Sequence, residues 1–144
     1  MKKLLVVLTA GLLLAAADAK KDLERMQGTW LVVANEVDGQ RAPEAEIKKA
    51  DLRLTIQGNS FTYTAGGKPV LEGSFTIDPA KKPKHLDAKG TLPNGTMTKS
   101  IGIYELDGDT MRVCFVEGQG ERPKEFKTAP GSNAILTVYK RVKP

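Results

Sequence analysis

Short stretches of alternating apolar and polar residues recur along most of this chain, and they limit the fold more than any other feature. In the clearest, Leu52, Leu54 and Ile56 occupy every second position. Successive side chains of a strand point to opposite faces, so this stretch predicts a strand with one buried face. Eight strands are expected, at 28–37, 52–57, 60–64, 70–77, 84–88, 99–106, 110–116 and 134–142.

Residues that favour tight turns separate these strands. Gly66-Gly67, Asn94-Gly95 and Asp107-Gly108 each fall between two of them. Glycine and asparagine tolerate the positive φ that hairpin turns require. Many short hairpin-linked strands indicate a sandwich or a barrel, and we favour the barrel because closure removes exposed sheet edges. The prediction is an all-β, antiparallel up-and-down barrel of about eight strands with one or two short helices.

Two segments are expected to be helical. Residues 43–50 start with Pro43 and carry acidic residues in the first turn and lysines in the last, which complements the helix dipole. Residues 22–27 are expected to form one turn, with Leu23 and Met26 on the same face.

The N-terminus is typical of a secretory signal peptide. Lys2 and Lys3 precede an apolar run, and Ala17-Asp18-Ala19 offers small residues for cleavage. A membrane anchor is the alternative, but a spanning helix needs about 20 apolar residues and this run is shorter. We expect residues 1–19 to be removed, leaving one domain at 20–144. The protein would be periplasmic or extracellular, with no transmembrane segment after cleavage.

The composition excludes several classes of protein. With 22 Lys+Arg against 17 Asp+Glu, the formal charge is +5, and there is one Cys and one His. These counts fit one ordinary globular domain and leave neither a disulfide framework nor a Cys/His zinc cluster. Five carboxylates lie near expected turns, where acidic side chains commonly stabilise the turn by hydrogen bonds to the backbone. They are Asp78, Asp87, Glu105, Asp107 and Asp109. No metal or other cofactor is expected.

His85, Asp87 and Cys114 are the candidates for catalysis. His85 and Asp87 would share a face of one strand, and a hydrolase would need Cys114 or a hydroxyl within about 3 Å of the imidazole. Cys114 lies in an apolar stretch, where a buried inert thiol is expected. We therefore expect a protein that is not an enzyme.

The segment Met26-Gln27-Gly28-Thr29-Trp30 resembles the Gly-x-Trp signature of lipocalins and other calycins. The resemblance implies a lipocalin-like barrel in which Trp30 closes one end. It also implies a basic residue of the last strand over the indole, for which Lys140 and Arg141 are both candidates.

A closer resemblance covers nearly all of the expected domain. Its motifs, in order, are Gln27–Trp30, Asp78-Pro79 with Lys82-Pro83-Lys84, Gly102–Thr110, Cys114-Phe115 and Arg122–Phe126. They are similar to a family of small exported lipocalin-like domains of planctomycete-type bacteria. The resemblance implies a lipocalin-like fold and export, and it implies no activity.

The first hypothesis for function is a binding module. A small apolar or amphipathic ligand would contact Phe61, Tyr63, Phe75, Ile103, Phe115 and Arg122. The remaining lining would include Leu54, Ile56, Leu71, Val113 and Val138. Phe126 is expected to fold inward and close one end, with Arg122 paired to Glu105 or Glu125.

The second hypothesis is an envelope interaction or scaffold protein with a filled barrel. Its contacts with an anionic envelope component would use basic loops around Lys81 and Lys82 or around Lys124 and Lys127, or else the expected helix at 43–50. Nucleic acid is not expected as a partner, because the chain shows no stacking platform.

Overall fold

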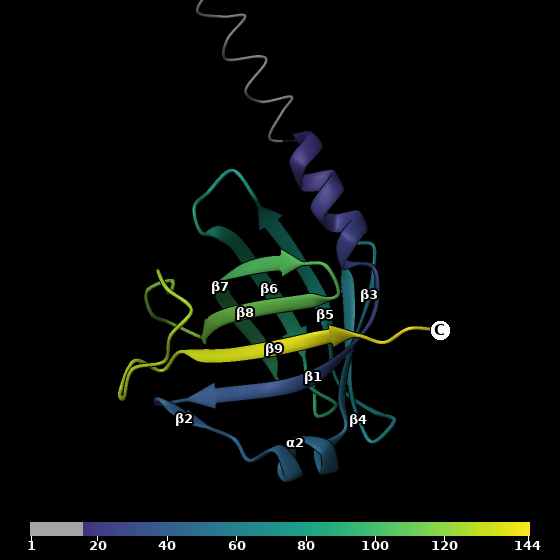
Figure 1. The fold of residues 1–144 in the computed structure, drawn as a ribbon, viewed down its shortest axis with the longest axis vertical. Coiled ribbons are helices and arrows are strands. Elements are labelled where there is room, and N and C mark those ends of the chain that lie inside the picture. The colour runs from purple at the N-terminus through teal and green to yellow at the C-terminus, as the bar shows by residue number, and fades with distance from the viewer. Residues whose placement is uncertain (1–15) are drawn as a thin grey trace, which may run out of the picture.

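The computed structural model describes residues 16–144, so most of the expected signal peptide lies outside the described part. Residues 16–26 form a helix that leads into the sheet, and the C-terminus follows the last strand (Figure 1). The elements are β1 (Gly28–Val37), β2 (Gln40–Arg41), α2 (Glu44–Ala50), β3 (Leu52–Gln57), β4 (Ser60–Ala65), β5 (Lys68–Asp78), β6 (Lys84–Thr91), β7 (Met97–Asp107), β8 (Thr110–Glu117) and β9 (Ile135–Arg141).

The sheet closes on itself through β1. The first part of β1, Gly28 to Leu31, pairs with β3, and Trp30 to Val37 pair with β9. All other neighbours pair antiparallel in chain order, so eight strands form a closed barrel and β2 is a short extension on β1. A bulge between Val32 and Ala34 shifts the register of β1 with β9, just after the residues of β1 that also pair with β3. The expected lipocalin-like up-and-down barrel is confirmed, and the sandwich is excluded.

The strand predicted at 84–88 is longer than its sequence indicates. β6 runs to Thr91, and β7 begins two residues before the expected Lys99. β6 contains charged residues and a glycine, which have weak strand preference. Because it is paired on both sides, tertiary context overrides that preference. α2 follows Pro43 as predicted and ends at Asp51 in the left-handed conformation.

One apolar cluster fills much of the barrel. The largest of its fully buried side chains are Trp30, Tyr104, Tyr139, Met26 and Met111. Met26 comes from the helix at residues 16–26, which therefore caps the end of the barrel that Trp30 occupies. Ile47 of α2 packs against the same cluster from a distant element.

A second apolar cluster lies on the outside of the barrel. Ile103, Cys114, Val116 and Ala134 are buried there with Phe126, because the loop at residues 118–133 lies beside β8 and β9 (Figure 1). β7 is thus apolar on both faces, and the alternation along it does not reveal which face is internal.

The predicted interior positions Ile103 and Val138 are wrong for this reason. Ile103 pairs with Cys114 and faces the outer cluster, while Tyr104 pairs with Val113 and faces inward. Val138 pairs with the outward-facing Arg112.

Candidate ligand-binding site

Trp30 closes one end of the barrel, as the calycin resemblance implies. Its side chain is fully buried, and its indole Nε1 donates a hydrogen bond of 2.9 Å to the carbonyl oxygen of Met26. The guanidinium carbon of Arg141 lies 4.3 Å from the ring centroid. Of the two basic candidates, Arg141 therefore covers the indole, and Lys140 on the opposite face is exposed.

Arg141 also binds the chain on either side of the helix end. Its Nη1 donates to the carbonyl oxygen of Gln27 at 2.7 Å, and its Nη2 donates to that of Arg25. Gly28 adopts a φ of 110°, and a Cβ there would lie 3.4 Å from Arg141 Nη1. Glycine at this position thus serves the backbone conformation and leaves room for the guanidinium.

A buried carboxylate lies beside this closed end. Asp22 is only 4% exposed and accepts hydrogen bonds of 2.8 Å from the Tyr104 hydroxyl and from Lys84 Nζ. Burial, followed by the hydrogen bond to Asp22, raises the pKa of Tyr104 well above its usual range. Sequence reasoning missed this cluster because the three residues meet only when the helix packs on the barrel.

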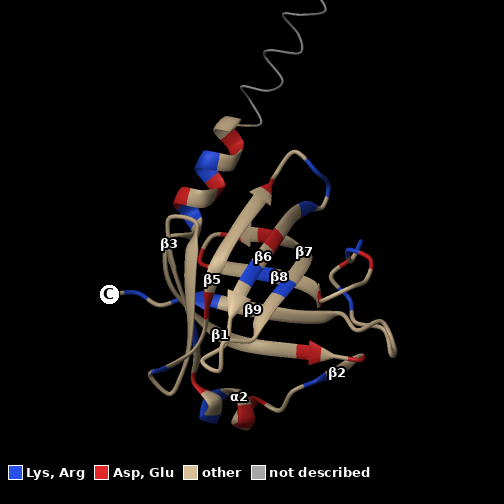
Figure 2. Cartoon of the chain, turned by 180° about the vertical axis from the view of Figure 1, so that it is seen from behind, with Lys and Arg blue, Asp and Glu red and all other residues tan. Residues whose placement is uncertain are grey.

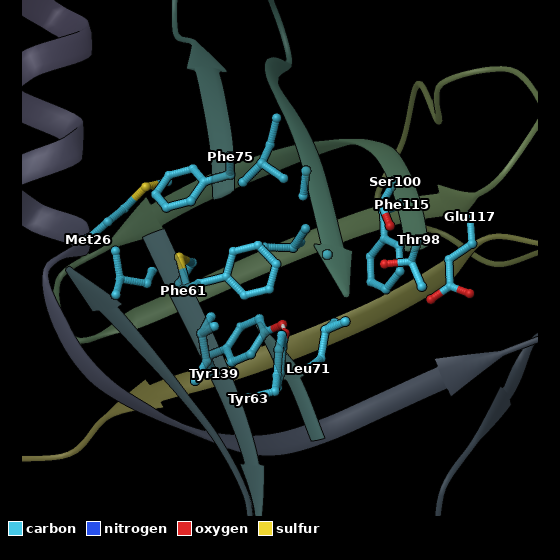
Figure 3. Close-up of a pocket in the computed structure, with 17 residues that line it drawn as sticks. Met26, Phe61, Tyr63, Leu71, Phe75, Thr98, Ser100, Phe115, Glu117 and Tyr139 are labelled. Carbon is cyan, nitrogen blue, oxygen red and sulfur yellow. Dashed lines mark hydrogen bonds between the residues drawn. The ribbon is translucent and has the colours of Figure 1, made fainter. Parts of the chain in front are cut away.

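The barrel interior contains a cavity of about 110 Å³ beyond this end (Figure 3). Four of the predicted ligand-binding residues line it, namely Phe61, Tyr63, Phe75 and Phe115. Phe61 packs edge-on against Tyr63, with ring centroids 6.1 Å apart. The aromatic wall of the predicted site is therefore present, and it comes from β4, β5 and β8.

Two phenols meet inside the barrel. The hydroxyls of Tyr63 and Tyr139 form a hydrogen bond with each other and lie next to Leu71 (Figure 3). Burial is the main cause that raises the pKa of Tyr63 well above its usual range and that of Tyr139 to about 12. Both hydroxyls therefore stay protonated over the physiological range, and they give the cavity a neutral polar group.

Polar side chains gather at the end of the cavity away from Met26. Thr98, Ser100 and Glu117 line this end, and Glu117 is exposed (Figure 3). Thr98 and Ser100 could not be predicted from the sequence, because their face of β7 is identified only by the register with β8. Because the lining residue Glu117 is exposed, the cavity reaches solvent at this end, which we call its mouth.

Arg122, the remaining predicted ligand-binding residue, lies outside the barrel. Its Nη1 donates to the carbonyl oxygens of Gly102 at 2.8 Å and of Leu86 at 3.2 Å, and it is 2.8 Å from Asp87 Oδ1. The expected pairing with Glu105 or Glu125 is wrong. Arg122 instead fastens the loop at residues 118–133 to β6 and β7.

Phe126 packs against the outer cluster, so the prediction that it closes an end of the barrel is also wrong. Its ring centroid lies 4.7 Å from the guanidinium carbon of Arg112, which pairs with Glu105 at 2.5 Å. The apolar outer faces of β7 to β9 explain this position, because they need a cover from the loop.

The possible catalytic residues do not meet. Ile103 lies between His85 and Cys114 in the sheet register, so two strand spacings, about 10 Å, separate them. Burial raises the pKa of the Cys114 thiol, whose Sγ donates to the carbonyl oxygen of Lys127 at 3.6 Å. Partial burial, followed by the charges of Arg122 and Lys81, lowers the pKa of His85.

Several of the carboxylates near the expected turns form ion pairs. Asp87 binds Arg122, Glu105 binds Arg112, and Asp109 lies 3.3 Å from Arg141 Nε. Within residues 16–144, no three His, Cys, Asp or Glu side chains converge in a way that could hold a metal ion. No helix in this part of the chain is long and apolar enough to cross a membrane.

The fold and the cavity define a class of protein: a small, closed, lipocalin-like β-barrel with one plugged end and an internal apolar cavity. Comparisons with protein-family models, curated proteins and solved structures found no match for the chain.

Proposed function

We propose that this protein is a binding module for a small amphipathic molecule, whose apolar end occupies the barrel cavity. The cavity of about 110 Å³, lined by aromatic and aliphatic side chains and opening beside polar ones, supports the proposal. The separation of His85 from Cys114 favours a role without catalysis.

The size of the cavity indicates how much of the ligand enters. Pockets that enclose a whole drug-sized ligand measure about 300–1,000 Å³, whereas an apolar cavity of about 150 Å³ binds benzene. We therefore expect a short alkyl or a single-ring group inside and the rest of the ligand outside. Thr98, Ser100 and the Glu117 carboxylate favour a head group that donates hydrogen bonds, such as a hydroxyl or an amine.

The alternative is a scaffold with a filled barrel and basic contact loops. The unfilled space in the barrel favours the binding module. In the described part of the chain, Lys and Arg residues are interspersed with Asp and Glu residues along the strands and loops (Figure 2). A contact through a single basic surface therefore has less support than binding inside the barrel.

We also propose that the chain is exported and belongs with the exported lipocalin-like domains that it resembles. Trp30 and Arg141 occupy the positions that the Gly-x-Trp resemblance to calycins implies, which supports the lipocalin-like part of this proposal. Expression of the full chain in a bacterial host with N-terminal sequencing of the periplasmic product tests this proposal. We expect the product to start at Lys20, and an intact N-terminus in the cytoplasm would contradict export.

Calorimetric titration with 1-alkanols and alkylamines of increasing length tests ligand binding. Affinity should rise by roughly fourfold per added CH₂ until the cavity is full. Ala88 lines the cavity, so Ala88→Leu should weaken binding at least about tenfold by filling the space. The matched control is Thr76→Leu, because Thr76 faces outward on the neighbouring strand.

Equal effects of Ala88→Leu and Thr76→Leu would place the binding site elsewhere. The absence of binding by every alkyl probe would refute the module. If the probes bind, native mass spectrometry of protein purified mildly from its own compartment identifies the class of the natural ligand by its retained mass.

A further inference from the structure

The β6–β7 hairpin has different chemistry on its two faces. Its inner face contributes Thr98 and Ser100 to the mouth of the cavity. Its outer face carries Lys89, Lys99 and Met97, because these residues alternate with the inward-facing ones. The turn of this hairpin lies at the end of the barrel opposite the helix at residues 16–26 (Figure 1).

The two lysines form an unfavourable pair in the isolated protein. Lys89 and Lys99 are direct cross-strand partners, and both are exposed. Like charges directly opposite each other destabilise a sheet. Neither lysine forms an ion pair with a residue in the described part of the chain, and the nearby Asp87 is paired with Arg122. An anionic partner would remove this repulsion.

Met97 adds an apolar group at the tip of the same hairpin. It is 77% exposed, and Val37, at 42%, is the other large exposed hydrophobic residue of the described chain. Val37 ends β1, so both lie at the end of the barrel where the mouth is. A single exposed apolar side chain is ordinary. Here, however, Met97 lies next to two lysines that have no ion-pair partner in the described part of the chain, and it lies at the mouth of an apolar cavity.

We propose that the β6–β7 hairpin docks on an anionic lipid surface, with Met97 inserted at the boundary between head groups and acyl chains and with Lys89 and Lys99 against lipid phosphates. Cationic and apolar groups side by side are the combination that holds proteins at such an interface. A soluble polyanion would use the lysines but leave Met97 without a partner. Docking would place the mouth of the cavity at the membrane, and this consequence rests on the proposed function.

Co-sedimentation of the exported protein that starts at Lys20 with lipid vesicles tests the docking, because the basic and apolar residues of the signal peptide would bind vesicles by themselves. We expect binding to vesicles of equimolar phosphatidylcholine and phosphatidylglycerol, weak binding to phosphatidylcholine alone, and loss of binding in high salt. The double variant Lys89→Gln/Lys99→Gln should bind roughly 25-fold more weakly, because each lysine near an anionic surface strengthens binding by roughly fivefold. Met97→Ser should bind roughly tenfold more weakly.

The matched control is Lys81→Gln/Lys82→Gln, which removes the same charge from the exposed β5–β6 turn at the opposite end of the barrel. Retention of vesicle binding by this control supports the proposal, and an equal loss overturns it. Failure of the unmodified protein to bind anionic vesicles also overturns it. If the lysine variant loses binding while Met97→Ser keeps it, the hairpin binds polyanions and the membrane proposal is wrong.

Ala88→Leu separates this proposal from the proposed function. It alters the cavity and leaves the outer face of the hairpin unchanged, so it should bind vesicles like the unmodified protein while losing the alkyl probes. Vesicle binding without any probe binding would refute the binding module and leave the docking intact, and the reverse result would refute the docking alone. Because the lysine substitutions remove a repulsion, the thermal midpoint of that variant should not fall, and thermal unfolding confirms that it is folded.

Discussion

The Arg141 guanidinium joins three parts of the molecule at the closed end of the barrel. It covers the Trp30 ring and donates hydrogen bonds to two carbonyl oxygens at the end of the first described helix. Trp30 and Arg141 are direct partners in the pairing of β1 with β9, so they lie on the same face. The sequence could not distinguish Arg141 from Lys140, because a shift of one residue in that register exchanges the two faces.

Arg141→Ala should lower the free energy of unfolding by about 2–3 kcal/mol. The estimate combines a cation–π contact of about 0.5–2 kcal/mol with the loss of charge-assisted hydrogen bonds. Urea unfolding followed by tryptophan fluorescence measures it, and Trp30 is the only tryptophan of the chain. Lys140→Ala is the control and should stay within about 0.5 kcal/mol of the unmodified protein. Similar losses for the two variants would argue against the specific role of Arg141.

The predicted site was correct where a strand has one apolar face. Phe61, Tyr63 and Phe75 alternate with polar residues that face solvent, and all three line the cavity. Ile103 was placed wrongly because β7 is apolar on both faces. Glu117 was missed because an exposed acidic residue at the end of a strand gives no signal of a nearby cavity.

At the scale of elements, the hairpins could be predicted from the sequence and the long loop could not. The alternation of apolar and polar residues and the Gly-rich turns are local features that can be read from adjacent residues. β3, β4 and β8 therefore match their expected positions closely. The loop at residues 118–133 has no period. Its position depends on contacts with distant strands, such as the hydrogen bond from Thr128 Oγ1 to Glu36 Oε1.

Phe126→Ala should uncover the outer cluster without changing the cavity. Phe126 packs against the cluster that buries Cys114, so its truncation should let thiol reagents reach that sulfur. We expect at least about a tenfold faster reaction of Cys114, together with a loss of about 1–3 kcal/mol in stability. Because the chain has a single cysteine, the absorbance of a released chromogenic thiol reports this site alone.

Lys124→Ala, an exposed position on the same loop, is the control for that experiment and should leave the thiol protected. Alkyl-probe binding should be the same in both variants, since the loop covers the outside of the barrel. An unchanged thiol rate in Phe126→Ala would show that other residues protect Cys114.

At the scale of the whole molecule, closure of the barrel places every tyrosine of the chain in the interior. The three tyrosines are Tyr63, Tyr104 and Tyr139, and each satisfies its hydroxyl with a partner inside or at the closed end. No buried side-chain nitrogen or oxygen of the described residues lacks a hydrogen-bond partner. The interior therefore tolerates neutral phenols but not phenolates, which would lose solvation on burial.

This arrangement predicts a steep loss of stability at alkaline pH. Unfolded tyrosines release their protons near pH 10, whereas burial raises the folded pKa of Tyr139 to about 12 and moves those of Tyr63 and Tyr104 in the same direction. Above pH 10 the folded state thus holds more protons than the unfolded state, and the free energy of unfolding falls as pH rises. Below pH 10 the phenols are protonated in both states, and their contribution to stability is complete.

Each tyrosine should contribute a slope of about 1.4 kcal/mol per pH unit, so three give about 4 kcal/mol per unit between pH 10 and 12. For a domain of ordinary stability, phenolate absorbance and loss of circular dichroism should therefore appear together as one transition in this range. Tyr63→Phe removes one titrating group and should reduce the slope by about a third. A phenolate signal that rises near pH 10 while the circular dichroism stays native would contradict the burial of these hydroxyls, and with it the closed interior on which the proposed ligand site depends.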